Sequence, residues 1–391
     1  MLFLTKNLST EYLQVIEQIN ILRDKLKYVT SDALHRWTAL LARTSAARAM
    51  VGSNSIEGIN VTLEEAVAVV DGEPPTSAEH EDTMALNGYW NAMTYIVQLS
   101  KDQNYIHNEG TIKSLHYMMV SHDLTKHPGR WRPGAIHISN TVTNQIVYDG
   151  PPVELVAPLM EELIQFLNTK SPQPLIKAAL AHLNFTMIHP FSDGNGRMAR
   201  AIQTMVLSRE GILDPHFSSI EEYIGDHPAE YYAVLAEVGQ GAWHPERDPL
   251  PWIRFCLNAH YHQAVSLLRR VVDIGKLWEA LEKEAKQRKF NERVVYALAD
   301  AAMGYKVRNP TYRKQTAVSN QVAKYDLKNL ADSGLLIPRG EKRGRYYLAG
   351  EILQEIRKQT KTQKTNVDPF AEIEKQSNAA QAELPGFSSN K

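Results

Sequence analysis

The sequence predicts a mainly helical fold that carries one small β-hairpin and ends in a module of mixed helix and strand. Apolar residues recur at helical spacing over most of the 391 residues. Residues that favour strands gather with turn residues mainly at 135–148 and at 335–348. We therefore expect a helical core, a hairpin on that core and a C-terminal α+β module.

The N-terminal part should consist of helices. A helix is expected from about 10 to 28, where apolar residues repeat at helical spacing: Leu13, Ile16, Ile19 and Leu22. A second helix is expected over 32–58. Two capping boxes, at Thr62–Glu65 and at Thr76–Glu79, predict two further helix starts.

The remaining helices follow from the same apolar spacing and from prolines near helix starts. Pro228 opens one of them. The others are expected over residues 108–121, 153–168, 174–187, 250–289, 291–303 and 320–332.

Composition limits the class of protein. The net charge of −1 argues against a globally basic nucleic-acid binder, and the single cysteine, Cys256, excludes an intrachain disulfide framework. No apolar run reaches transmembrane length, and the segment Met1–Lys6 is too short for the core of a signal peptide. These observations predict a cytoplasmic protein.

The most informative segment runs from His189 to Arg200 and reads HPFSDGNGRMAR. His189 can accept a proton near neutral pH, and Asp193 offers the oxygen ligand that Mg²⁺ shares with phosphates. The glycines allow backbone N–H groups to approach a ligand closely. The helical spacing that follows places this turn at a helix N-terminus, which favours an anion.

Two arginines complete this segment. Arg197 and Arg200 lie three residues apart, so both should project near the first turn of the helix, where guanidinium groups can bind phosphate oxygens. The alternative is a structural turn, because DGNG turns and His-Pro helix ends are common. A turn alone does not require the histidine, the aspartate and both arginines, so the full segment favours a nucleoside triphosphate site.

This segment resembles the signature of the Fic family, HPFx[D/E]GNGRxxR, at every defined position. The resemblance implies a Fic-type helical core whose enzymes move AMP from ATP to a Ser, Thr or Tyr hydroxyl of a protein and release pyrophosphate. By the same resemblance, His189 is the general base and Asp193 holds Mg²⁺ against the α- and β-phosphates.

The resemblance also implies how the polyphosphate is held. The backbone amides of Gly194, Asn195 and Gly196 would form the anion hole. Arg197 would contact the β-phosphate, and Arg200 would contact the γ-phosphate.

A second segment, Ser53–Gly58, fits the inhibitory pattern [S/T]xxxE[G/N] of Fic proteins. The resemblance implies that Glu57 pairs with Arg200 and keeps the γ-phosphate away, so that the enzyme is auto-inhibited. The alternative is that Ser53 and Glu57 form an ordinary i, i+4 pair on a solvated helix, with Gly58 as its C-cap.

Other residues extend the resemblance. The stretch Gly129–Arg132 is similar to one that precedes the family's β-hairpin flap, expected here from Ala135 to Tyr148, which would hold the target protein by strand addition. The alternative is an ordinary surface hairpin. After Pro228, either Tyr231 or Tyr232 would pack near the adenine, and a structural role for both is an equal alternative.

The C-terminal module resembles a winged helix, because a helix, a glycine turn and a strand pair with a basic tip follow one another. Its basic side chains would face DNA if it binds DNA: Lys324, Lys328, Arg339, Lys342, Arg343 and Arg345. Such modules also serve protein contacts. The polar residues 360–391 predict a disordered tail.

These observations predict a helical region at 1–105, a catalytic core at 106–265, a connecting helix at 266–289 and a winged helix at 290–350. The predicted function is an auto-inhibited protein adenylyltransferase that uses ATP and Mg²⁺ and acts on a protein hydroxyl, including one of its own. The alternatives are removal of AMP from a modified protein and a nucleotide-sensing DNA-binding regulator. A homodimer is a further expectation from the family.

Overall fold

The computed structural model describes residues 1–5, 7–31, 36–73, 80–139, 146–210, 215–364 and 367–382. The chain is mainly helical, as predicted, and the described strands form two small antiparallel pairs. In the described part of the chain, no helix is both long and apolar enough to cross a membrane.

The centre of the fold is a pair of consecutive helices, α7 (Pro174–Ile188) and α8 (Asn195–Arg209). Nearly every residue of both helices is buried, so other helices must cover them on all sides. The helices that contact this pair come from both halves of the chain: α2 (Thr38–Ser55), α4 (His80–Lys101), α6 (Val153–Asn168), α9 (Pro215–Ser218) and α12 (Leu250–Gln287). A further layer packs on these helices: α5 (Glu109–Val120) on α4 and α6, and α10 (Glu221–Asp226) and α11 (Pro228–Gly239) on α12.

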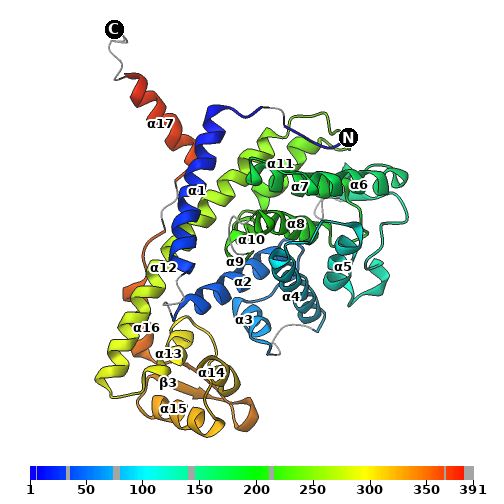
Figure 1. The fold of residues 1–391 in the computed structure, drawn as a ribbon. Coiled ribbons are helices and arrows are strands. Elements are labelled where there is room, and N and C mark those ends of the chain that lie inside the picture. Colours follow the sequence, from blue (N-terminus) through cyan, green and yellow to red (C-terminus); the bar gives the residue numbers. More distant parts are fainter. Residues whose placement is uncertain are drawn as a thin grey trace.

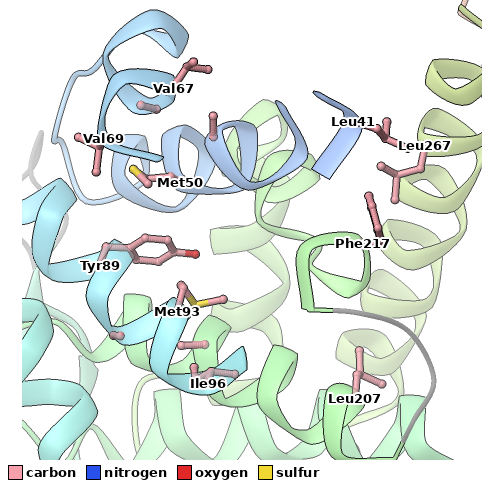
Figure 2. Packing of buried hydrophobic residues seen from close by; sticks show 14 of the residues in the cluster. Leu41, Met50, Val67, Val69, Tyr89, Met93, Ile96, Leu207, Phe217 and Leu267 are labelled. Atoms are coloured by element: carbon pink, nitrogen blue, oxygen red, sulfur yellow. The ribbon is translucent and has the colours of Figure 1, made fainter. Parts of the chain in front are cut away.

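The N-terminal helices lie along one side of this core. α1 (Thr10–Ser31) runs beside the long helix α12 (Leu250–Gln287), as Figure 1 shows. α2 (Thr38–Ser55) packs against α10 and against α3 (Leu63–Asp71). In Figure 2, Met50 of α2 lies near Tyr89 of α4, and Leu41 lies close to Leu267 of α12, so α2 is held between the core and the long helix.

Most predicted helices are present, and α3 begins with the capping box that the sequence predicts. The Thr62 hydroxyl accepts the N–H of Glu65 at 3.2 Å, while the Thr62 N–H donates to the Glu65 carboxylate at 2.8 Å, which is the expected capping box. The second box, Thr76–Glu79, lies outside the described residues. The helix expected over 32–58 is observed as α2, and residues 32–35 also lie outside them.

The predicted hairpin is present in part. β1 (His137–Ser139) pairs antiparallel with β2 (Ile146–Asp149), and the residues between them are not among those described. The Tyr148 hydroxyl donates to the carbonyl of Met187 at 2.8 Å. This bond fastens the hairpin to the end of α7, two residues before His189.

The C-terminal module contains η2 (Glu292–Val294), α13 (Val295–Ala302), α14 (Asn309–Thr316), α15 (Asn320–Asp332), β3 (Leu336–Arg339), η3 (Lys342–Gly344), β4 (Tyr346–Ala349) and α16 (Glu351–Thr360). β3 and β4 are antiparallel. This order agrees with the helix, strand and tip pattern read from the sequence, and the winged-helix assignment stays a prediction. α14 and α16 were not expected.

The domain boundaries stay a prediction. α12 is continuous across the expected boundary at 265–266, as the helix expected over 250–289 implies. The C-terminal module extends to α16, which packs on α12 and α13.

The tail expected to be disordered contains α17 (Pro369–Ala382), so the prediction is wrong for that part. Phe370 and Ile373 are buried, and the Phe370 ring packs edge-on against Tyr12 of α1 at 5.3 Å between centroids. The Arg254 guanidinium lies 4.0 Å from the centre of the same ring. Two apolar residues one helical turn apart are enough to hold this polar segment on α1.

We expect Phe370→Ala to release α17, because truncation of a buried phenylalanine costs about 3 kcal/mol. Hydrogen exchange followed by mass spectrometry should show faster exchange in 369–375 and in the α1 turn around Tyr12. Glu374→Ala, on the exposed face of the same helix, is the control and should exchange like the wild type. Equal protection in both variants would contradict this role of Phe370.

Candidate active site

The candidate site is the link between α7 and α8, residues 189–194. His189 ends α7 at a φ of 51°, and Gly194 precedes α8 at a φ of 75°, so both ends of the link adopt the left-handed region. That conformation costs a non-glycine residue about 1 kcal/mol. The Asn195 side chain fixes the link by accepting the N–H of Phe191 at 2.9 Å and donating to its carbonyl at 2.8 Å.

His189 is positioned as a proton acceptor. Its Nδ1 lies 3.2 Å from the carbonyl oxygen of Thr186. Because a carbonyl only accepts, Nδ1 must carry the proton, which leaves the lone pair on Nε2. Burial lowers the pKa of His189 to about 4, so the ring is neutral at physiological pH.

Arg132 holds the backbone of this histidine. Its Nε donates to the His189 carbonyl at 2.9 Å, and its backbone N–H donates to the Pro190 carbonyl at 2.8 Å. The guanidinium also donates to the carbonyls of Gly134 and Pro151. Sequence reasoning named Arg132 only within the stretch before the hairpin, and no pattern indicated that it fastens the hairpin to the base.

His116, from α5, was missed by sequence reasoning. Its Nδ1 accepts the Gly129 N–H at 2.9 Å, so Nε2 carries the proton and donates to the Asp193 carbonyl at 2.9 Å. Burial lowers the pKa of His116 to about 4, and the ring stacks on Phe191 with 3.6 Å between centroids. A neutral imidazole thus holds the loop of Gly129 and the loop of Asp193 together.

Asp193 is available as a metal ligand but is paired here. Its carboxylate lies 2.9 Å from Lys126 Nζ and 3.8 Å from Arg197 NH2. Burial would raise the pKa of Asp193, but these cations lower it, so the group is ionised. Sequence reasoning did not identify Lys126, which sits in the short helix η1 (Leu124–Lys126).

The donor set fits Mg²⁺ bound together with phosphates. In the described part of the chain, no cluster of three or more His, Cys, Asp or Glu side chains could hold a metal alone. A single carboxylate with phosphate oxygens and water is a usual Mg²⁺ environment. Asp193, half-buried at the mouth of the loop, supplies that carboxylate.

The two arginines carry buried donors that lack partners. Nε and NH1 of Arg197 and NH1 of Arg200 have no hydrogen-bond acceptor among the described residues. Both side chains are nearly fully buried, at 3% and 1% exposed. Since unpaired buried cationic donors are costly, they indicate a place for an anion beside the loop.

The predicted contact between Glu57 and Arg200 is present. The Glu57 carboxylate accepts from Arg200 NH2 at 2.7 Å. The Ser53 hydroxyl accepts from Arg200 Nε at 2.9 Å, and the Ser53 carbonyl accepts from NH2 at 2.8 Å. Burial alone would lower the pKa of Arg200, but the Glu57 carboxylate raises it well above its usual value.

Glu57 also lies against the start of α8. A Cβ built on Gly196 would come within 2.3 Å of the Glu57 carboxylate oxygen. The carboxylate therefore occupies the space beside the Gly196 backbone, where an anion bound at this helix N-terminus would lie.

The two tyrosines of α11 differ. Tyr231 is 2% exposed, and its hydroxyl lies 3.1 Å from Nε2 of the buried His182, so it packs in the core. Tyr232 is 53% exposed, and its hydroxyl donates to the Ile56 carbonyl at 3.1 Å. Only Tyr232 of this pair has a face open to a ligand.

Comparisons with known proteins agree with this geometry. Residues 106–207 match the model of the Fic/DOC family. The chain is 27% identical over 249 residues to protein adenylyltransferase Fic of Nematostella vectensis, covering 62% of this chain and 53% of that protein. It is 28% identical over 167 residues to a probable protein adenylyltransferase of Aquifex aeolicus, covering 42% of this chain and 49% of that protein. The chain thus spans about half the length of these curated relatives.

Solved structures show the same fold. A Fic family protein from Desulfovibrio desulfuricans superposes with a TM-score of 0.59 at 20% identity, over 88% of this chain and 98% of that one. Fic-1 from C. elegans superposes with a TM-score of 0.53 at 22% identity, over 66% of this chain and 72% of that one. The match at 106–207, which contains the loop 189–200, and the shared fold show that the chain is similar to proteins of the Fic/DOC family.

Proposed function

We propose that this chain is an auto-inhibited protein adenylyltransferase, which moves AMP from ATP to a hydroxyl group of a protein. The observation that carries the proposal is the set of unpaired, buried guanidinium donors of Arg197 and Arg200 beside a loop that presents a neutral histidine. The names of the curated relatives support the same activity.

At the α-phosphorus, the reaction forms one bond and breaks one. The target hydroxyl oxygen attacks the α-phosphorus of ATP, and the bond between that phosphorus and the bridging oxygen breaks, so pyrophosphate leaves. His189 Nε2 takes the hydroxyl proton, since its lone pair is free. No covalent enzyme intermediate is required, and positioning with charge neutralisation supplies the acceleration.

The polyphosphate would be held by groups already oriented in the fold. The amides of Gly194, Asn195 and Gly196 open α8 and would face it. Arg197 would bind the β-phosphate. Asp193 would hold Mg²⁺, which supplies positive charge against the α- and β-phosphates when bound.

Inhibition would act on the γ-phosphate. Arg200 can bind the γ-phosphate only if its NH2 group is released from the Glu57 carboxylate. The same carboxylate would repel a phosphate beside Gly196. ATP would then bind in an unproductive pose. Tyr232, which is bonded to the Ile56 carbonyl, is the proposed adenine-side contact.

The hairpin is the proposed site for the target. β1 is at the edge of its pair, and Ile146 and Val147 of β2 are exposed, so an extended segment of a target protein could add to it. Through Tyr148 and Arg132, the hairpin is fastened to the backbone around His189. Such a target would therefore present its hydroxyl near the base.

The decisive experiment compares the wild type, Glu57→Gly and Glu57→Gly with His189→Ala. Each receives Mg²⁺ with ATP labelled at the α- or the γ-phosphate, and label on protein is measured, including on the enzyme itself. We expect label from the α position, at least about tenfold more in Glu57→Gly than in the wild type, and none without His189.

Other outcomes of the same experiment are equally clear. Label from the γ position would indicate phosphate transfer and contradict the proposal. No label in Glu57→Gly, with loss of AMP from a pre-modified protein in the wild type, would favour AMP removal. Glu57 favours that second candidate, because its carboxylate beside Gly196 could orient a water molecule.

The activity should not fall near pH 6.5, where an ordinary histidine gains a proton. Burial lowers the pKa of His189 to about 4, so the base is neutral above that pH and gains a proton only below it. Loss of Glu57, whose charge raises this pKa, cannot move it upward. We expect kcat/KM of Glu57→Gly to be flat between pH 5.5 and about 7.5. A fall centred near pH 6.5 would contradict His189 as the buried base.

DNA binding is a second candidate role, confined to the C-terminal module. Four exposed side chains share one face of α15: Gln321, Lys324, Tyr325 and Lys328. Two lysines and an aromatic ring at i, i+1 and i+4 on an exposed helix suit a phosphate backbone and its bases.

We expect the full chain to shift a DNA duplex in a native gel at low salt, and Lys324→Glu with Lys328→Glu to abolish the shift. Lys276→Glu, at an exposed lysine of α12, is the control for the change of charge and should retain the shift. Absence of a shift by the wild type at low salt would contradict this role.

A further inference from the structure

We propose that the C-terminal module, residues 292–360, holds α2 in the position that places Glu57 on Arg200, so that displacement of this module releases the inhibition. This inference rests on the proposed function, because it concerns how the Glu57 contact is regulated. α2 is the link, since it contacts the module at one end and Arg200 at the other.

The first contact is a buried ion cluster. Arg43 of α2 pairs with Asp300 of α13 and, at 3.3 Å, with Asp71 at the end of α3. The three side chains are 10%, 7% and 17% exposed. Removal of one partner from such a cluster leaves a buried charge uncompensated, so the cluster fixes α2 strongly to the module.

The second contact lies one residue further along α2. The Tyr305 hydroxyl, from the segment after α13, donates to the Thr44 hydroxyl at 3.1 Å, and both residues are buried. The Tyr305 ring also faces the Arg43 guanidinium at 5.5 Å. Neighbouring residues of α2 are thus bound by neighbouring parts of the module.

The module also binds α3, which packs on α2. Arg308 donates to the Glu73 carboxylate at 2.6 Å, and the Thr311 hydroxyl donates to the same carboxylate. Lys306 pairs with Glu64 at 2.6 Å. The unit formed by α2 and α3 is therefore attached to the module at several points, and Figure 1 shows α13 and α14 of the module beside α3.

The far end of α2 carries the inhibitory contact. Ser53 lies ten residues after Arg43, which corresponds to about 15 Å along a helix. Near it, Gly52 sits directly against α10, where a Cβ would come within 2.3 Å of the Glu221 carbonyl. Because α2 fits so closely against α10 at Gly52, it has no space to move sideways there. We therefore expect a displacement of α2 at Arg43 to be transmitted along the helix to Ser53 and Glu57.

The ion pairs between the module and the α2–α3 unit explain why the signal that releases Glu57 should act on the module. Most of the polar contacts described above between the module and the α2–α3 unit join opposite charges, and those of Asp300 and Tyr305 lie close together on α2, so a displacement of the module would weaken both together. The module also exposes Lys324, Tyr325 and Lys328 on α15, a helix that makes none of the contacts with α2 described above, so a ligand bound there could act on the module.

The test is the activity of Asp300→Asn, alone and combined with Glu57→Gly, measured as label transferred from α-labelled ATP with Mg²⁺. We expect Asp300→Asn alone to raise the transfer by about fivefold or more. In the Glu57→Gly background it should change nothing, because the contact that it weakens no longer has an inhibitory residue to place.

Matched variants keep the test specific. Glu292→Gln removes an exposed carboxylate of the same module that pairs with Arg36, and it should leave the wild-type level unchanged. Tyr305→Phe removes only the hydroxyl bond to Thr44, and it should give a smaller increase than Asp300→Asn. If Asp300→Asn fails to fold, Tyr305→Phe alone tests the inference. Thermal unfolding of each variant will show whether it folds.

The outcomes separate this inference from the proposed function. If Glu57→Gly is active and both Asp300→Asn and Tyr305→Phe remain silent, the coupling is wrong and the proposed function stands. If Asp300→Asn activates equally with and without Glu57, its effect does not pass through the inhibitory contact, and the coupling is again wrong. If Glu57→Gly is itself inactive, the proposed function falls and the inference falls with it.

Discussion

The burial of α7 and α8 is the constraint on which the site depends. Two consecutive helices with almost no exposed face must be joined by a short link, and that link carries its polar backbone into the centre of the protein. Its groups must then be satisfied by other parts of the chain. Asn195, Arg132 and His116 do so, and their bonds leave His189 and the start of α8 oriented in one way.

The same burial explains the balance of charge. Two guanidinium groups lie within the first turns of α8. Among the described residues, hydrogen-bond acceptors pair with most donors of Arg200 but with fewer donors of Arg197. Glu57 supplies one carboxylate to this excess of positive charge, and Asp193 supplies another. A polyphosphate would supply more, so the nucleotide-bound and the Glu57-paired arrangements would satisfy the same arginines with different anions.

Sequence predicted the elements better than the tertiary contacts. The helices at 153–168 and 320–332 were predicted with their observed bounds, because apolar spacing, Pro152 and Ser319 mark them locally. The signature residues lie together for the same reason, since they are consecutive. Glu57 was linked to Arg200 only through the family resemblance, because 143 residues separate them.

What the sequence could not show has a physical cause in each case. His116 and Lys126 act through contacts with Asp193, which lies far from both in the sequence, and no spacing encodes those contacts. Tyr231 and Tyr232 are adjacent, so their roles depend on the rotation of α11, which packing decides. The helix at 369–382 has a polar composition, and only the partner surface on α1 makes its two apolar residues sufficient.

The long helix α12 ties these parts into one unit. It packs against α1, α7 and α11 of the core, against α13 and α16 of the C-terminal module, and against α17. A fragment limited to residues 106–207 would lack this helix and would expose apolar faces of α7 that Trp252 and its neighbours cover. Loss of structure in α12 should therefore spread, and the helices that it joins should melt together, so that limited proteolysis releases no stable catalytic fragment.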